Sequence, residues 1–125
     1  MTGKAILSAF IAALVIKFFI LDFMIAEGNS MVPAIKSGAI LTVYKASYGI
    51  RLPGSSIYIL SWGRPKEGDV VIFYTPTGEI AVKRCGESLA DGFFYVFGDN
   101  SSQSYDSRNY GPIPKSHIIG KVLGK

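Results

Sequence analysis

The chain has 125 residues, 49% of them apolar, and a net charge of +4 from 13 basic and 9 acidic residues. This length suits one domain with a modest core. The basic residues are scattered and form no run, so no nucleic-acid-binding surface is expected. With one cysteine, Cys85, and one histidine, His117, the chain can form neither an internal disulfide nor a usual zinc site. We expect no metal or other cofactor, and a thiol that packs as a small buried hydrophobe.

The first segment of the chain is almost wholly apolar. Residues 5–16 carry no charge, Lys17 interrupts the run, and residues 18–21 are apolar again. A helix over residues 2–21 would be about 30 Å long, which suits the core of a bilayer, and Lys17 near its end can reach the interface. We therefore expect residues 1–21 to be a transmembrane anchor and residues 22–125 to be a separate β domain.

The apolar segment has two alternative interpretations. A cleaved secretory signal would end near residues 24–26, but Lys17 splits its apolar region. A buried core helix is disfavoured because the remaining chain has the pattern of β structure. Lys4 is the only charge ahead of the apolar run, which weakly favours a cytoplasmic N-terminus and a C-terminal domain across the membrane.

Beyond Asp22 the pattern changes to short β-type runs separated by turn residues. Seven of these runs are predicted to be strands: 23–27, 40–44, 57–60, 70–74, 80–84, 93–97 and 118–123. No helix of normal length, repeat or second domain is expected after the first segment, and residues 101–109 are predicted to be a polar loop. The fold class is therefore mainly β, a compact sheet or barrel behind one N-terminal helix.

Ser30 is a candidate nucleophile directly after the apolar segment. A serine hydroxyl needs a base to take its proton. His117 has no acidic residue close in sequence, and a satisfied or surface histidine is the plainer interpretation. Lys83 lies in an apolar strand, where alternation places it on one face with Ala81 and Cys85 while Arg84 points the other way, toward solvent or a partner. Burial there would lower the pKa of the amine toward neutrality.

Taken singly, each of these residues has an ordinary interpretation. Ser30 is also typical of a turn or cap, and Lys83 of an edge strand. A third element changes the balance: a dense polar loop over residues 98–108 follows the strand 93–97. Such a loop can fold back through Asp–Arg pairing and bring a hydroxyl to the amine. The same residues are also typical of a solvated turn with a surface ion pair.

Together these segments resemble the type I signal peptidases, Ser/Lys-dyad membrane serine endopeptidases, and the chain looks like a short member of that family. The resemblance runs from about Lys17 to Lys121. Its boxes are GNSMVP at 28–33, YGIRLP at 48–53, EGDVVIF at 67–73, KR at 83–84, and GDN at 98–100 with the polar residues up to 108. Each box is weakly specific, but their order behind an apolar segment is strongly so.

The resemblance implies roles for individual residues. Ser30 would be the nucleophile and one oxyanion donor through its backbone N–H, Lys83 the general base, and Ser104 the hydroxyl that orients the amine. Ion pairs that hold the loop would come from Asp99, Asp106 and Arg108. Walls of the pockets for small side chains at the −1 and −3 positions would come from Ala26, Met31, Ile35, Ala81 and Val82.

The family also implies a setting. The substrate would be the signal peptide of an exported preprotein, added as a strand near residues 24–28 and 81–83. The partners would be that peptide, the lipid bilayer and the secretion machinery. The expected location is the inner (plasma) membrane, single-pass, with the catalytic domain on the extracytoplasmic side; an organelle inner membrane is the alternative.

Some features depart from the family pattern. Gly28 stands where some members carry a second oxyanion hydroxyl, and only 13 residues separate Arg84 from Gly98, where larger members insert a β segment. The rival functions are a specialised pilin or conjugative-transfer peptidase, a self-cleaving Ser/Lys repressor, and a non-enzymatic membrane-tethered β domain that presents a binding loop.

Overall fold

One curled sheet forms most of the molecule. The computed structural model describes residues 2–55 and 57–125. Within these residues seven strands form one sheet in the order β1-β2-β9-β5-β6-β7-β8, and β3 pairs with β4 in a separate hairpin. The pairs within both sheets are antiparallel. The strands are β1 (Leu21–Ile25), β2 (Ile40–Tyr44), β3 (Gly49–Arg51), β4 (Tyr58–Ser61), β5 (Val70–Tyr74), β6 (Ile80–Ser88), β7 (Phe93–Phe97), β8 (Ile113–Pro114) and β9 (Ile118–Val122).

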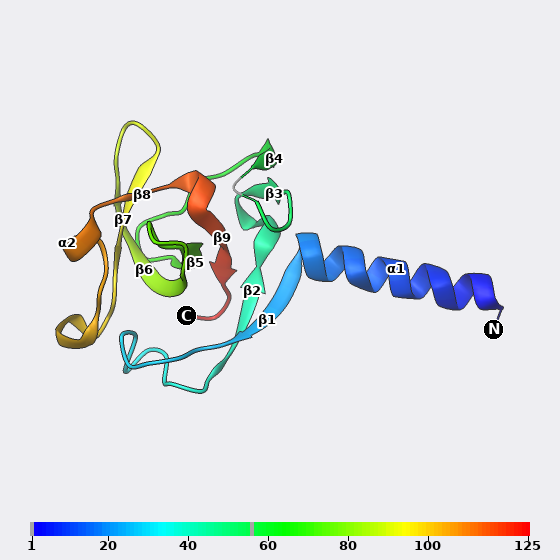
Figure 1. The fold of residues 1–125 in the computed structure, drawn as a ribbon, viewed down its shortest axis with the longest axis horizontal. Helices are drawn as coiled ribbons and strands as arrows, with labels where there is room; N and C mark the ends of the chain where they lie inside the picture. The colour runs from blue at the N-terminus through cyan, green and yellow to red at the C-terminus, as the bar shows by residue number, and fades with distance from the viewer. Residues whose placement is uncertain (1, 56) are drawn as a thin grey trace.

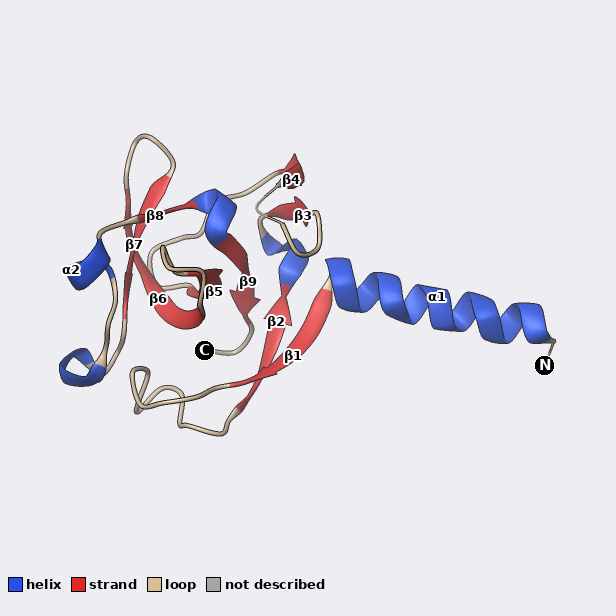
Figure 2. Ribbon diagram, viewed as in Figure 1, coloured by secondary structure: helices blue, strands red, loops and turns tan. Residues whose placement is uncertain are grey.

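The strand β5 lies at the centre of the sheet and is covered on both faces. Val70, Val71, Ile72 and Phe73 are all buried. Because side chains alternate along a strand, β5 contributes Val70 and Ile72 to one apolar cluster and Val71 and Phe73 to the other. The sheet therefore has an apolar cluster against each face at β5. The predicted mainly β class is confirmed, and Figures 1 and 2 show the curled sheet.

The N-terminal helix is shorter than predicted. The helix α1 runs over Gly3–Phe19, is capped by the Thr2 hydroxyl, and extends away from the β domain (Figure 1). It ends before Leu21 because β1 pairs with β2 from Leu21 onward, and the N–H of Lys45 donates to the carbonyl of Ile20 at 2.6 Å. Within residues 2–55 and 57–125 no helix combines the length and apolarity needed to cross a membrane.

Several short elements were not predicted. These are β3, β8, the helix α2 (Ser107–Tyr110), which overlaps the end of the predicted polar loop, and the 3-10 helices at Lys45–Ser47, Ser101–Gln103 and Lys115–His117. The strand β6 also continues four residues past the expected end at Arg84. The elements β3, β8 and α2 have two to four residues each, which is too few to show a hydrophobic period in the sequence. They form only because a partner strand or a buried cap is in place.

Two stretches of backbone edge are left without a strand partner in the described pairings. β1 pairs with β2 alone, and Ile80 to Val82 of β6 pair with β5 alone, because β7 joins β6 only from Arg84. A cleft of about 310 Å³ lies between these stretches, and both line it. The fold thus presents two open strand edges to one groove.

Candidate active site

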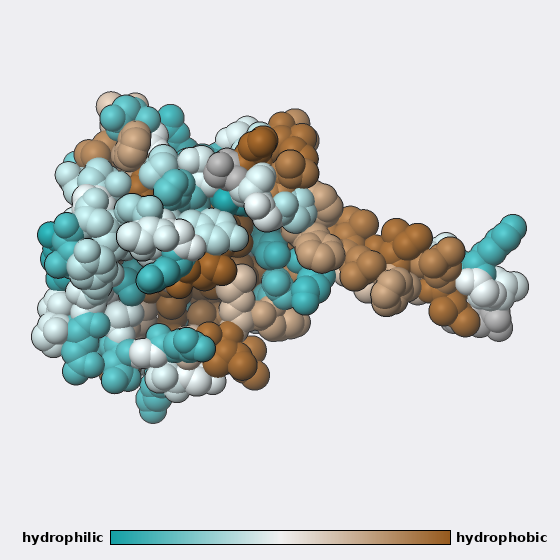
Figure 3. Space-filling view, in the orientation of Figure 1, coloured by the Kyte–Doolittle hydropathy of each residue, from teal (hydrophilic) through white to brown (hydrophobic). Residues whose placement is uncertain are grey.

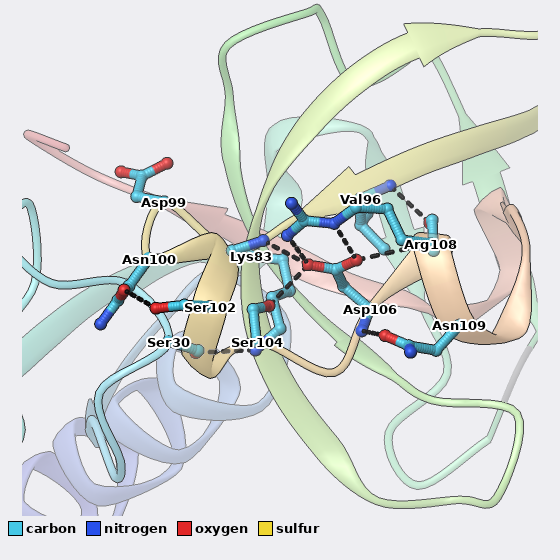
Figure 4. Close-up of polar contacts among 12 residues, drawn as sticks. Ser30, Lys83, Val96, Asp99, Asn100, Ser102, Ser104, Asp106, Arg108 and Asn109 are labelled. Atoms are coloured by element: carbon cyan, nitrogen blue, oxygen red, sulfur yellow. Dashed lines mark hydrogen bonds and ion pairs between the residues drawn. The ribbon is translucent and has the colours of Figure 1, made fainter.

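Ser30 and Lys83 meet at one end of this cleft. Ser30 lies in the loop between β1 and β2, and Lys83 lies on β6 opposite Val71 of β5. The Lys83 Nζ is 2.8 Å from the Ser30 Oγ, a hydrogen bond between residues 53 apart in the chain. Both residues line the cleft, and Figure 4 shows them together beside the loop that follows β7.

The Lys83 amine is held in an apolar environment. Lys83 is only 6% exposed and shares a face of β6 with the buried Cys85. Burial lowers the pKa of the Lys83 amine from its ordinary value, while the charge of Asp106 opposes this shift. Within the described residues no carboxylate lies within ion-pair distance of the amine. A buried amine without such a partner is shifted toward its neutral form.

Asp106 organises the polar loop. Its carboxylate is fully buried and accepts hydrogen bonds from the Gly98 N–H at 2.8 Å, the Ser104 hydroxyl at 2.6 Å, and the Arg108 guanidinium at 2.6 and 3.0 Å. Burial alone would raise the pKa of Asp106, but these hydrogen bonds outweigh it and hold the pKa well below its ordinary value. Asp106 also caps α2 through the Arg108 N–H. The loop is therefore built around one charged carboxylate.

Ser104 lies beside the pair, but its hydroxyl is directed to Asp106. A hydrogen bond from Ser104 to Lys83 is not among the contacts of the described residues. A Cβ built on Gly98 would lie 2.1 Å from the Ser104 Oγ and 2.7 Å from the Ser30 carbonyl oxygen. Only a glycine therefore allows the loop to approach both serines this closely.

Asp99 pairs with an arginine outside the polar loop. Its carboxylate pairs with Arg84 of β6, at 2.9 Å to Nε and 2.8 Å to Nη2, while Arg108 pairs with Asp106. Arg84 also donates to the Gly68 carbonyl at 2.9 Å. Arg84 thus points away from the amine, as the strand alternation predicted, and ties β6 to the loop.

Asn100 connects the loop to the backbone around Ser30. Its N–H donates to the Ser30 carbonyl at 2.8 Å, and its side-chain amide donates to the Asn29 carbonyl at 3.0 Å. The Asp99 N–H contacts the Met31 sulfur at 3.4 Å. Sequence reasoning assigned Asn100 no function, because these hydrogen bonds span about 70 residues of chain. They clamp the serine-bearing loop at its backbone.

The five predicted pocket residues separate into two groups. Ala26, Ala81 and Val82 line the cleft, together with Met24, Ile25 and Glu27. Met31 and Ile35 do not line it, because both are 2% exposed and pack in the core cluster beneath. Two residues that were not expected to act in the site lie elsewhere: Cys85 is buried, and burial raises the pKa of its thiol to about 12, while His117 hydrogen-bonds the Tyr74 carbonyl at 2.9 Å.

These features define a class of protein: a small β domain that holds a serine hydroxyl against a buried lysine at one end of a cleft between open strand edges. A family model described as "Signal peptidase, peptidase S26" matches residues 1–87 and 81–124, which is nearly the whole chain. The chain belongs to this family.

Individual relatives are similar over parts of the chain. Signal peptidase I of Pseudomonas fluorescens is 37% identical over 75 residues, covering 60% of this chain and 26% of the relative. Signal peptidase I T of Bacillus subtilis is 33% identical over 86% of this chain and 53% of the relative. A probable signal peptidase I-1 of Synechocystis is 24% identical over 92% of this chain and 76% of its own length. The match thus spans about a quarter of the Pseudomonas relative.

Proposed function

We propose that this protein is a serine endopeptidase that cleaves signal peptides from preproteins after small residues, with Ser30 as nucleophile and Lys83 as general base. The observation that carries the proposal is the 2.8 Å contact between the Lys83 Nζ and the Ser30 Oγ, made by an amine that is 6% exposed. Family membership supports the same chemistry.

The proposed mechanism uses the neutral amine. Lys83 takes the Ser30 proton as the Oγ attacks the scissile carbonyl, and the backbone N–H of Ser30 donates to the developing oxyanion. Lys83 then gives the proton to the leaving amine, which departs as the new N-terminus of the mature protein. In the second half, Lys83 takes a proton from water, whose oxygen attacks the acyl-enzyme, and returns it to Ser30.

The polar loop would hold Ser30 and Lys83 in the geometry that the proton transfer needs. In the proposal Ser104 orients the amine, from a hydroxyl anchored by Asp106 at 2.6 Å. Asp106 and Arg108 hold the loop together, and the Arg84–Asp99 pair ties it to β6. A bidentate Arg–carboxylate pair supplies orientation as well as attraction.

The cleft would bind the substrate as an added strand. The free edges of β1 and of residues 80–82 offer backbone groups on both sides of an extended peptide, which gives affinity with little sequence dependence. In the proposal Ala26, Ala81 and Val82 form the walls for the side chains at −1 and −3, which are small because these walls lie close to the dyad.

We propose also that α1 attaches the catalytic domain, residues 22–125, to a lipid bilayer on its extracytoplasmic side. None of the side chains of α1 is buried, although nearly all are apolar. The exposed apolar residues Ile57, Ile59, Leu60 and Trp62 add to this surface in and around β4, and Figure 3 shows apolar patches on α1 and at the β3–β4 hairpin. Apolar surface of this extent on a small domain is typical of a membrane contact.

The test is cleavage of a purified preprotein by the full chain in detergent. Ser30→Ala and Lys83→Met are expected to lower kcat/KM by about 10³-fold or more, because each removes one partner of the proton transfer. Lys36→Met, at an exposed position, is the matched control and should cleave at the wild-type rate. Cleavage by a folded Lys83→Met variant at the wild-type rate would refute the proposal.

A further inference from the structure

A buried arginine outside the cleft has an unused hydrogen-bond donor. Arg51, at the end of β3, is 8% exposed. Its Nη1 donates to the carbonyls of Ser116 at 2.6 Å and Ile118 at 2.8 Å, and its guanidinium lies over the rings of Tyr58 and Tyr74. Its Nη2 is buried and has no hydrogen-bond partner among residues 2–55 and 57–125. A buried charged donor left without a hydrogen-bond partner is costly, so an acceptor that reached the Arg51 guanidinium would stabilise it.

Arg51 lines a cavity at the junction between α1 and the β domain. The cavity has a volume of about 180 Å³. This is several times the ~30 Å³ that one water occupies in the liquid. Its polar side carries two cations, Arg51 and Lys45. Its remaining wall is mostly apolar and includes Phe18 and Phe19 of α1, Met24, Ile80 and Ile119.

The charges at this cavity do not cancel. The Lys45 Nζ lies 3.5 Å from an Asp22 carboxylate oxygen, which is a long ion-pair distance. Lys45 and Arg51 together carry two positive charges against the single negative charge of Asp22. A planar guanidinium and a neighbouring ammonium suit the oxygens of a phosphate group.

We propose that this cavity binds the phosphate of an anionic phospholipid, with Arg51 and Lys45 as its ligands and the acyl chains lying along α1. The apolar wall begins at Phe18 and Phe19, the last turn of a helix that has no charge over residues 5–16 and no buried side chain. A headgroup that enters here leaves its chains against that helix. Neither Ser30 nor Lys83 lines this cavity, although Met24 and Ile80 line both it and the cleft. Lipid binding there does not depend on peptidase activity.

The test measures thermal unfolding of the full chain in neutral detergent micelles with phosphatidylglycerol, with phosphatidylcholine, or with inorganic phosphate. A ligand that binds the folded state raises Tm, and for a domain of this size we expect a rise of about 3 °C or more with phosphatidylglycerol at saturation. Lys45→Gln should weaken the apparent affinity for that lipid about tenfold. Lys17→Gln is the matched control, because it removes the same charge from the last turn of α1 outside the cavity.

A second variant acts in the opposite direction. Asp22→Asn removes the carboxylate that competes for Lys45 and should tighten the binding of phosphatidylglycerol. Arg51→Gln should abolish it, and if that variant does not fold, the Lys45 and Asp22 variants still decide the matter. Equal stabilisation by inorganic phosphate would support the phosphate site and assign it a soluble ligand. The proposal would be overturned if neither phosphatidylglycerol nor inorganic phosphate stabilised the wild type, if phosphatidylcholine stabilised it as much as phosphatidylglycerol, or if Lys45→Gln and Lys17→Gln lost affinity equally.

Discussion

Lys83 and Lys115 each lie against a serine hydroxyl, and their surroundings separate their roles. The Lys115 Nζ donates to the carbonyls of Tyr48 and Gly63 and to the Ser61 hydroxyl. Burial lowers the pKa of both lysines, but two carbonyl acceptors use the hydrogens of an ammonium and hold Lys115 charged. Among the residues that the structure describes, the Lys83 amine hydrogen-bonds only the Ser30 hydroxyl, so its environment favours the neutral amine.

The pH dependence of cleavage should therefore report on Lys83. We expect kcat/KM to rise with pH through a pKa below the 10.5 of an unperturbed lysine, because only the neutral amine can take the Ser30 proton. The measurement is kcat/KM for a peptide substrate from pH 6 to 10. A profile that stays flat over this range would contradict the assignment of Lys83 as the base.

Replacing Lys83 should make the protein more stable at neutral pH. A lysine whose pKa is lowered on folding must lose a proton or bury a charge, so the unfolded state binds more protons and wild-type stability rises with pH up to about 10.5. Lys83→Met removes this cost and should raise the free energy of unfolding by about 1 kcal/mol at pH 7. Denaturant unfolding at pH 7 and pH 10 checks this: the difference between variant and wild type should shrink as pH rises. A variant less stable than wild type at pH 7 would show that the lysine is structural.

The elements that form the site are held by contacts between loops distant in sequence. The loop after β1 carries Ser30 and β6 carries Lys83. The loop after β7 contacts the first through Gly98 and Asn100, and β6 through the Asp99–Arg84 pair. Neither loop contains hydrogen-bonded strand pairing that would define its shape. The relative position of the two serines therefore depends on how closely these loops approach each other.

Gly98→Ala tests this close approach. The added Cβ would lie 2.1 Å from the Ser104 Oγ and 2.7 Å from the Ser30 carbonyl oxygen, so one loop must move. We expect kcat to fall about 10²-fold, because a displacement of about 1 Å at the reacting atoms costs this much. Gly63→Ala is the control, since its Cβ would meet nothing closer than 3.5 Å. Wild-type kcat in the Gly98 variant would mean that the loop does not position the pair.

At the scale of the whole molecule, α1 and the β domain are joined by a narrow connection. No side chain of α1 is buried, and both core clusters consist of residues from the β domain and its loops. The free energy of folding of the domain therefore comes from the sheet and not from the helix. The helix contributes apolar surface for a contact outside the protein.

Removal of the helix should separate folding from membrane binding. A chain of residues 20–125 is expected to unfold cooperatively with a Tm within about 5 °C of the full chain, because few native contacts are lost. It should cleave a soluble peptide at a similar rate and lose most of its binding to lipid vesicles, as measured by co-flotation. Undiminished flotation of the shortened chain would contradict the proposed attachment through α1.

Much of the fold was readable from the sequence because the signals are local. The runs at 40–44, 70–74 and 93–97 match β2, β5 and β7 residue for residue, since alternation or a continuous apolar run within five residues is enough to indicate a strand. The end of α1 was not readable in this way. Ile20 and Leu21 are apolar and compatible with a helix, but Ile20 is the C-cap of α1 and Leu21 becomes a strand residue through the pairing of β1 with β2.

The sequence by itself determined the residue types: a serine after an apolar segment, a lysine in an apolar strand, and a polar loop rich in Asp, Ser and Arg. Tertiary structure alone decided which of them meet. It placed the Lys83 Nζ 2.8 Å from the Ser30 Oγ and paired Asp99 with Arg84. It also directed the Ser104 hydroxyl to Asp106 and placed Met31 and Ile35 in the core. The physical reason is that hydrogen bonds and packing depend on distances between atoms far apart in the chain, and periodicity carries no information about those distances.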